Sequence, residues 1–251
     1  MPNAARQPGT VRSYLELCRA SNLPTVWTNV LAASLLGVPW AFAPGMPPRP
    51  FWARAAWAAL SLSLTYLGGM ALNDVLDVEE DRIKKPQRPI PSGRISRRGA
   101  ALFAAALFAS GLAILFALRS PPALGAGLLL VAVIYLYDRL HSQSWLTVLL
   151  MASCRFLVFI VAAFITVGIC NHLVILCASV QFLYIVGLTA LARWEKAAPR
   201  SFRIPPIPWL LAGISLVDGA MMAVFVHPLC FFAGAAGAAA TRLLQTQVRG
   251  D

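Results

Sequence analysis

Charged residues are scarce in this sequence, because Asp, Glu, Lys and Arg together make up only 12% of its 251 residues. Hydrophobic residues make up 59%, and the mean hydropathy is +0.69. A soluble domain of this length needs more polar surface, so the composition excludes an ordinary water-soluble protein. The sequence instead predicts a single membrane domain over residues 1–251, which begins with a polar segment, residues 1–22.

Histidine and regularly spaced cysteine are also scarce. The three histidines lie far apart, and the five cysteines lie in or beside apolar segments without the spacing of metal ligands. These absences exclude a metal centre built on imidazole or thiolate, and they exclude the disulfide framework of a small secreted protein. We expect the cysteines to be packing residues.

Long apolar runs are what the sequence has instead, and a transmembrane helix needs roughly 20 apolar residues to cross about 30 Å of hydrocarbon. We predict an all-α, polytopic transmembrane helical bundle of about eight spans, and we leave a ninth span open. The predicted spans lie near residues 24–43, 54–73, 99–118, 122–138, 145–169, 173–191, 206–226 and 228–243. The small residues Ala41 to Ala43 could end a signal peptide, but a second apolar run follows closely, so we expect the first span to be retained.

Basic residues outnumber acidic ones by 21 to 10, and they gather in alternate loops. The amino-terminal segment, residues 82–98 and residues 193–203 carry most of them, whereas Arg49, Arg54 and Arg119 lie in the loops between. Because Lys and Arg mark the cytoplasmic side of short loops, we predict a multi-pass protein of a bacterial cytoplasmic membrane with both termini inside. The net charge of +11 then borders anionic lipid, and we expect no nucleic-acid partner.

The acidic residues are clustered. Half of the ten lie in one short segment at the end of the second apolar run, namely Asp74, Asp77, Glu79, Glu80 and Asp81. At about 100° per residue, a helix places Asp74, Asp77 and Asp81 on one face and turns the two glutamates elsewhere. Carboxylates at the C-terminal end of a helix oppose the helix dipole and repel one another, so a compensating cation is expected.

Mg²⁺ is the cation that this donor set suits. It takes hard oxygen ligands, typically one or two carboxylates together with waters and substrate phosphates. We therefore predict that Asp74, Asp77 and Asp81 bind Mg²⁺ and, with the adjacent Asn73, form the catalytic face. The implied ligand is a diphosphate.

Five cations follow the acidic cluster and suit phosphate oxygens, which Arg contacts bidentately. They are Arg82, Lys84, Lys85, Arg88 and Arg94, and we predict that they bind the diphosphate. Three prolines and Gly93 keep residues 85–93 out of regular helix, which favours an ordered loop over the site. The alternative is a solvated loop, residues 74–98, whose basic residues only enforce topology.

The pattern Asn73-Asp74-x-x-Asp77-x-x-x-Asp81, followed by Arg88-Pro-Ile-Pro-Ser-Gly93-Arg, resembles the first signature of the UbiA-type prenyltransferase superfamily. The resemblance extends to Arg19-Ala-Ser-Asn22, to Tyr137-Asp138 and to Cys154-Arg155, and it weakens after residue 195. It implies a helical bundle around a central cavity that opens laterally to lipid. It also implies two Asp-rich segments that bind Mg²⁺ and an isoprenyl diphosphate, with a lipophilic acceptor that is aromatic, quinone-like or another small molecule.

The sequence departs from this family at the second Asp-rich segment, which should follow the sixth span. It has Arg193-Trp-Glu195 there, so only one acid remains and a second Mg²⁺ site like the first is not expected. Branches associated with small biosynthetic operons carry such a shortened motif, and this sequence resembles them. Possible roles at the substrate or at this second site are assigned to Asn22, Tyr137, Asp138, Arg155, Arg193 and Glu195.

The resemblance implies a membrane enzyme that transfers a prenyl group to the acceptor with Mg²⁺-assisted release of pyrophosphate. An apolar cavity would exclude water, and tyrosine faces would stabilise positive charge on the prenyl group. Tyr66, Tyr137 and Tyr184 are candidates, although tyrosines near span ends also form interfacial belts. Arg155 and Asp218 are charged residues inside spans and therefore functional suspects, but Asp218 has no evident partner in the sequence.

Two other functions compete with this prediction. A non-catalytic or transport protein that binds prenyl lipids would keep the first motif and release no pyrophosphate. A soluble terpene synthase also uses Asp-rich helices and Mg²⁺, but the long apolar runs exclude it.

Overall fold

The computed structural model describes residues 10–38, 49–140, 147–197 and 207–247, and these residues form helices and connecting turns without a β-strand. The all-α prediction is confirmed. The helices are α1 (Thr10–Leu17), η1 (Ala20–Asn22), α2 (Leu23–Gly37), α3 (Arg49–Leu76), α4 (Val78–Lys84), α5 (Arg97–Ala117), α6 (Pro121–Leu140), α7 (Thr147–Thr166), α8 (His172–Ala197), α9 (Ile207–Phe225), η3 (Pro228–Cys230) and α10 (Phe231–Gln247).

Six described helices are long and apolar enough to cross a membrane, namely α3 and α5 to α9. The predicted number of eight spans is not confirmed, because α2 has 15 residues and α10 has 17. The first predicted span continues into residues 39–43, including Ala41 to Ala43, which lie outside the described residues. Helix α10 is rich in Gly and Ala, and its last two turns contain the polar residues Thr241, Arg242, Gln245, Thr246 and Gln247, which lower its hydropathy.

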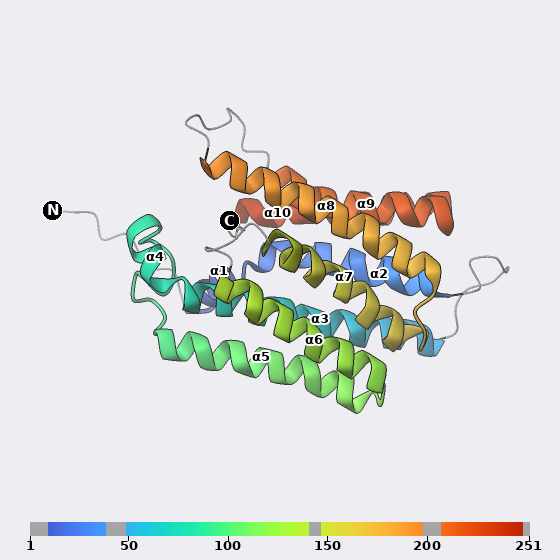
Figure 1. Cartoon of the computed structure of the whole chain (residues 1–251), viewed down its shortest axis with the longest axis horizontal. Helices are drawn as coiled ribbons and strands as arrows, with labels where there is room; N and C mark the ends of the chain where they lie inside the picture. The colour runs from blue at the N-terminus through green and yellow to red at the C-terminus, as the bar shows by residue number, and fades with distance from the viewer. Residues whose placement is uncertain (1–9, 39–48, 141–146, 198–206, 248–251) are drawn as a thin grey trace.

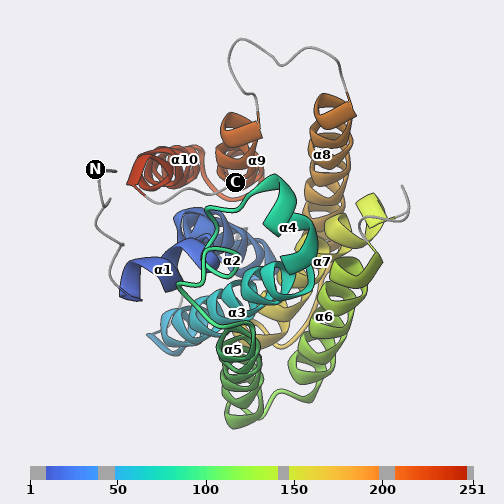
Figure 2. The ribbon, with the colours of Figure 1, turned by 90° about the vertical axis from the view of Figure 1, so that its left-hand side faces the viewer.

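The long helices run side by side along one axis, with neighbours in the chain mostly antiparallel (Figure 1). Viewed along that axis, α2, α3 and α7 lie inward, and α5, α6, α8, α9 and α10 surround them (Figure 2). Helix α10 approaches α9 so closely at Gly234 that a side chain there would collide with the backbone of Ser215 and Gly219. Small residues at such positions allow membrane helices to pack backbone against backbone.

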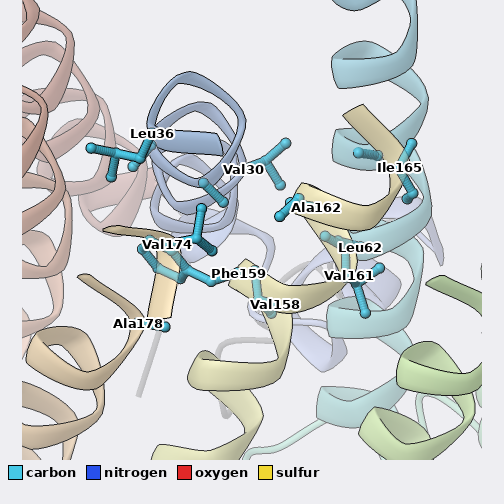
Figure 3. Close-up of a cluster of buried hydrophobic side chains, with 14 of the residues drawn as sticks. Val30, Leu36, Leu62, Val158, Phe159, Val161, Ala162, Ile165, Val174 and Ala178 are labelled. Carbon is cyan, nitrogen blue, oxygen red and sulfur yellow. The ribbon is translucent and has the colours of Figure 1, made fainter. Parts of the chain in front are cut away.

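The main hydrophobic cluster holds the inward helices together (Figure 3). Phe159 on α7 is fully buried, and it packs among residues that include Val30 of α2, Leu62 of α3 and Val174 of α8. Close packing of this kind drives helix association in a membrane, where lipid tails are as apolar as the helix surfaces. Helix α7 therefore lies at the centre of the packed bundle.

We call the end of the bundle where α3 ends and α5 begins the basic end. Helices α1 and α4 lie there, and so do the ends of α6, α8 and α10 (Figure 1). Arg54 and Arg119 lie at the opposite end, near the start of α3 and after the end of α5. This division agrees with the predicted alternation of basic loops, but which end faces the cytoplasm stays a prediction.

The segment between α4 and α5 is an ordered, non-helical loop, as predicted. Ile90 and Ile95 anchor it, because they are buried in a second cluster with Leu17 of α1 and Val75 of α3. Its backbone is closed by turns, including a hydrogen bond from the Ile95 amide to the Pro89 carbonyl at 3.1 Å. Gly93 has φ 77°, a left-handed conformation that favours glycine.

Candidate active site

The acidic cluster spans the junction of α3 and α4. The backbone stays close to helical across it, because the Asp77 amide bonds the Asn73 carbonyl at 2.9 Å and the Asp81 amide bonds the Asp77 carbonyl at 2.8 Å. Asp74 and Asp81 are buried on the same face, whereas Glu79 and Glu80 are exposed, as the helical periodicity predicts.

Arg88 of the loop bridges two of these carboxylates. Its Nη1 lies 3.1 Å from Asp74 Oδ1 and 2.5 Å from Asp81 Oδ2, and all three side chains are largely shielded from solvent. The two carboxylates therefore converge on one point. Asp77 is half-buried at the helix junction, and its predicted metal role stays a prediction.

Arg19 contacts the same face and shares the Asp74 Oδ1 atom with Arg88. Its Nη2 donates to Asn73 Oδ1 at 3.2 Å and to Asp74 Oδ1 at 3.1 Å, and its Nη1 lies 3.7 Å from the Met70 sulfur. The backbone of Arg19 is left-handed, with φ 46°, at the turn between α1 and η1. Such a conformation costs a non-glycine residue about 1 kcal/mol, which suggests that this turn is held to aim the guanidinium at the carboxylates.

A cavity of about 540 Å³ opens beside these residues at the basic end. We call it the basic cavity; it is lined by Asp74, Arg19, Arg88, Lys85 and Arg94 and by α1 residues that include Glu16. Arg94 is fixed there by an ion pair with Glu16 Oε2 at 2.6 Å and a hydrogen bond to the Gln87 carbonyl at 2.8 Å. Cations thus outnumber acids around a space large enough for a diphosphate.

Arg82 and Lys84 are placed differently from the other predicted diphosphate ligands. Both are exposed on α4, where Arg82 pairs with Glu79 at 2.8 Å and Lys84 pairs with Glu80 at 2.7 Å. The hydrogen bond from Glu80 raises the pKa of Lys84. Neither side chain lines the basic cavity, because the helix turns this face away from Asp74 and Asp81.

A second, smaller cavity lies inside the bundle, and we call it the inner cavity. Its lining is mainly apolar and includes Tyr66, Tyr137, Asp138 and Arg155. Asn73 joins it to the acidic cluster, since its Nδ2 donates to Asp138 Oδ1 at 3.2 Å while its own Oδ1 accepts from Arg19. Asn73 thus links Asp138, which lines the inner cavity, to Arg19, which lines the basic cavity.

Arg155 of α7 is 8% exposed and anchored to α2. Its Nη1 donates to Asn29 Oδ1 at 2.7 Å, and its Nη2 donates to Thr25 Oγ1 at 2.9 Å. The Asn29 amide in turn donates to both carboxylate oxygens of Asp218 on α9, at 3.0 and 2.7 Å. The partner of Asp218 that sequence reasoning did not identify is therefore Asn29, itself a polar residue within an apolar segment.

The remaining predicted residues lie outside both cavities. Asn22 Oδ1 accepts from Gln245 Nε2 at 2.9 Å, which ties η1 to α10. The Tyr184 hydroxyl donates to the Leu210 carbonyl at 2.8 Å, so this tyrosine packs α8 against α9. Arg193 donates to the Thr147 hydroxyl, and Glu195 is half-exposed near the end of α8.

The cysteines agree with the packing prediction, since all five are free and each is at least partly buried. Cys18 lies next to Arg19, where burial and the Asp74 carboxylate raise the pKa of its thiol to about 12. A thiol that stays protonated is a poor metal ligand.

The described residues contain no group of three His, Cys, Asp or Glu side chains arranged to hold a metal ion. The pair of Asp74 and Asp81 nevertheless fits Mg²⁺, because their oxygens converge and Mg²⁺ needs only one or two carboxylates when phosphate and water complete its shell. Arg88 holds that position in this structure.

A sequence model of the UbiA prenyltransferase family matches residues 30–208, which include the acidic cluster, the loop, Asp138 and Arg155. The chain belongs to the UbiA prenyltransferase family. The match ends after α8, where the resemblance noted in the sequence also weakens.

Curated relatives in this family are digeranylgeranylglyceryl phosphate synthases. The protein of Sulfolobus acidocaldarius is 36% identical over 130 residues, which cover 52% of this chain and 44% of the relative. The protein of Ignicoccus hospitalis is 41% identical over 130 residues, which cover 51% of this chain and 38% of the relative. The similarity thus spans less than half the length of these relatives.

Solved structures share the fold. A digeranylgeranylglyceryl phosphate synthase has a TM-score of 0.60 at 19% identity, with 94% of each chain covered. A UbiA homologue from Archaeoglobus fulgidus, bound to DMAPP and Mg²⁺, has a TM-score of 0.59 at 19% identity and covers 95% of this chain and 89% of its own. At this identity the likeness establishes the UbiA-type helical bundle.

Proposed function

We propose that the protein transfers a prenyl group from an isoprenyl diphosphate to a lipophilic acceptor. The observation that carries this proposal is the convergence of Asp74 and Asp81 on Arg88 at the wall of the basic cavity. Relatives named digeranylgeranylglyceryl phosphate synthases, and homologues solved with DMAPP, GPP and Mg²⁺, support the same reaction class.

The diphosphate would bind in the basic cavity. Arg19, Arg88, Arg94 and Lys85 line it and offer charge-assisted hydrogen bonds to phosphate oxygens. Arg82 and Lys84 are weaker candidates, because their charges are already paired on the outer face of α4.

Asp74 and Asp81 would hold Mg²⁺, with Asp77 as a further ligand, and Asn73 would orient Asp138 and Arg19 around them. Mg²⁺, when bound, withdraws charge from the leaving diphosphate. Arg88 would release the two carboxylates and turn to the phosphates, so that one cation is exchanged for another.

The reaction breaks the bond between the prenyl C1 and the diphosphate oxygen, and it forms a bond between C1 and the acceptor, which loses a proton. Tyr66 and Tyr137 line the inner cavity, where their aromatic faces would stabilise positive charge on the prenyl group. The apolar lining would keep water from capturing it. Tyr184, Arg193 and Glu195 are outside this arrangement.

We further infer that the basic end faces the cytoplasm, since it carries most of the cations at the helix ends. A soluble diphosphate would then enter from the aqueous side, while the lipophilic acceptor would reach the bundle from the bilayer.

The test is pyrophosphate release together with mass spectrometry of lipid products. Purified protein is supplied with prenyl diphosphates of several lengths and with acceptors that include 4-hydroxybenzoate and geranylgeranylglyceryl phosphate, with and without Mg²⁺. We expect a Mg²⁺-dependent prenylated product that is lost in Asp77→Asn. Tight binding of prenyl diphosphate without turnover across the panel would instead support a non-catalytic or transport protein.

A further inference from the structure

Arg155 is a buried cation with unused hydrogen-bonding capacity. A guanidinium has five N–H donors, and two of those on Arg155 serve Asn29 and Thr25. The other three have no hydrogen-bond partner among the residues that the structure describes, although the side chain is more than nine-tenths buried. It lines the inner cavity, so a ligand there would meet these donors.

The arrangement around Arg155 keeps its charge available. The nearest acid in the network, Asp218, does not pair with it directly; Asn29 stands between them and bonds both. A direct salt bridge would satisfy the guanidinium with a bidentate carboxylate. The contact through Asn29 instead holds the plane of the Arg155 guanidinium in place and leaves its other N–H donors unbound.

Arg155 lies near Tyr66, at a distance from the acidic cluster that a small bound molecule can span. Its guanidinium carbon lies 6.0 Å from the centre of the Tyr66 ring. Tyr66 precedes Asn73 by two turns of α3, or about 10 Å along the helix axis. A molecule bound to Arg155 would therefore extend toward the diphosphate end through the Tyr66 and Asp138 side of the inner cavity.

We propose that Arg155 selects the acceptor, and that the acceptor carries an oxyanion, either a carboxylate or a phosphate, at the end that enters the inner cavity. This inference rests on the proposed prenyl transfer, whose acceptor it specifies. The inner cavity has a volume of about 70 Å³, room for a group of a few non-hydrogen atoms. In apolar surroundings an unpaired anion is costly, so the cation supplies both affinity and discrimination against neutral analogues.

The experiment measures equilibrium binding of two matched pairs of probes to the full chain in lipid nanodiscs, with Mg²⁺ and a non-hydrolysable prenyl diphosphate analogue present. One pair is 4-hydroxybenzoate and its methyl ester. The other is geranylgeranylglyceryl phosphate and geranylgeranylglycerol. We expect one oxyanion to bind at least tenfold more tightly than its neutral partner, and the pair that responds tells a carboxylate from a phosphate acceptor.

Three variants test whether Arg155 is responsible. The double variant Arg155→Gln, Asp218→Asn removes both charges and leaves no buried ion unpaired, and it should abolish the preference for the oxyanion. Arg155→Lys keeps the charge but loses the planar fork, so the preference should fall several-fold. Arg54→Gln, at the opposite end of the bundle, should keep the full preference.

Binding of the prenyl diphosphate analogue by each variant reports that the protein is folded. Equal binding of ion and neutral analogue in both pairs, or a preference that persists in the double variant, would overturn the assignment and make Arg155 a structural residue. Failure of the proposed function looks different: oxyanion preference would be present, but no acceptor would yield a prenylated product or pyrophosphate.

Discussion

The bundle contains two networks of charged side chains, and they differ in whether the cation contacts the carboxylate directly. At the basic end, Arg19 and Arg88 bond the carboxylates of Asp74 and Asp81 directly and line an open cavity. Deeper in the bundle, the side-chain amide of Asn29 lies between Arg155 and Asp218 and hydrogen-bonds both. We expect the direct ion pairs beside the cavity to exchange partners when a ligand or metal binds, and the pair joined through Asn29 to keep a constant geometry.

This difference fits two separate roles, one for the leaving group and one for the acceptor. The basic end would handle the charge of the leaving group, which must be bound and released in every cycle. The buried network would hold one cation in a constant position for the acceptor. Asn73 links the basic end to the inner cavity, because it contacts Arg19 on one side and Asp138 on the other, and Asp138 lines the inner cavity together with Arg155.

The largest expected effect comes from Asp74→Asn. The change removes one carboxylate of the converging pair and two ion pairs, so kcat for pyrophosphate release should fall about 10³-fold. Glu80→Gln is the matched control, since Glu80 is exposed and pairs only with Lys84 among the contacts of α4. Comparable activity in Asp74→Asn and the wild type would remove Asp74 from the catalytic face.

Asn29→Ala should damage stability more than charge removal does. The variant leaves Arg155 and Asp218 buried without their shared partner, which we expect to lower the free energy of unfolding by about 3 kcal/mol. The measurement is reversible unfolding in mixed micelles. The double variant Arg155→Gln, Asp218→Asn should lose clearly less; an equal or larger loss would show that the contact through Asn29 is not the source of the penalty.

Arg88→Lys tests whether the exchange at the basic end needs a guanidinium. Lysine keeps the charge but cannot bridge two oxygens in a plane, so kcat/KM for the prenyl diphosphate should drop about tenfold or more. Lys84→Ala, on the outer face of α4, should leave kcat/KM close to the wild-type value. A larger loss of kcat/KM in Lys84→Ala than in Arg88→Lys would instead place the diphosphate site on α4.

The smallest effect concerns the loop that carries Arg88. Gly93→Ala meets no neighbouring atom within 4 Å but retains φ 77°, so it should destabilise the protein by about 1 kcal/mol. Gly125→Ala also meets nothing within 4 Å but lies in the exposed part of helix α6, where Ala is preferred by about 0.5 to 1 kcal/mol. Thermal unfolding midpoints that shift in opposite directions would confirm the backbone requirement at Gly93.

The basic end was largely predictable from the sequence because its key relations are local. Helical periodicity puts Asp74 and Asp81 on one face, and Arg88, which contacts both, follows them by 14 and 7 residues. The same periodicity, taken further, would have separated Arg82 and Lys84 from this face, since each follows an outward-facing glutamate by three or four residues.

The buried network was not predictable in the same way. Asn29 and Asp218 are 189 residues apart in the sequence, and Asn29 and Arg155 are 126 apart, so only the packing of α2, α7 and α9 brings them together. Polar residues inside apolar segments indicate that some partner exists, but not which one. The predicted number of spans was not confirmed, since α2 has 15 residues and α10 has 17 within the part of the chain that the structure describes.

The most direct test of the central claim is a crystal structure with Mn²⁺ and a non-hydrolysable prenyl diphosphate analogue, with the metal located by anomalous scattering. We predict a Mn²⁺ peak between Asp74 and Asp81, with Arg88 displaced onto the diphosphate in the basic cavity. A metal and diphosphate bound elsewhere, with the contacts of Arg88 to Asp74 and Asp81 unchanged, would contradict it.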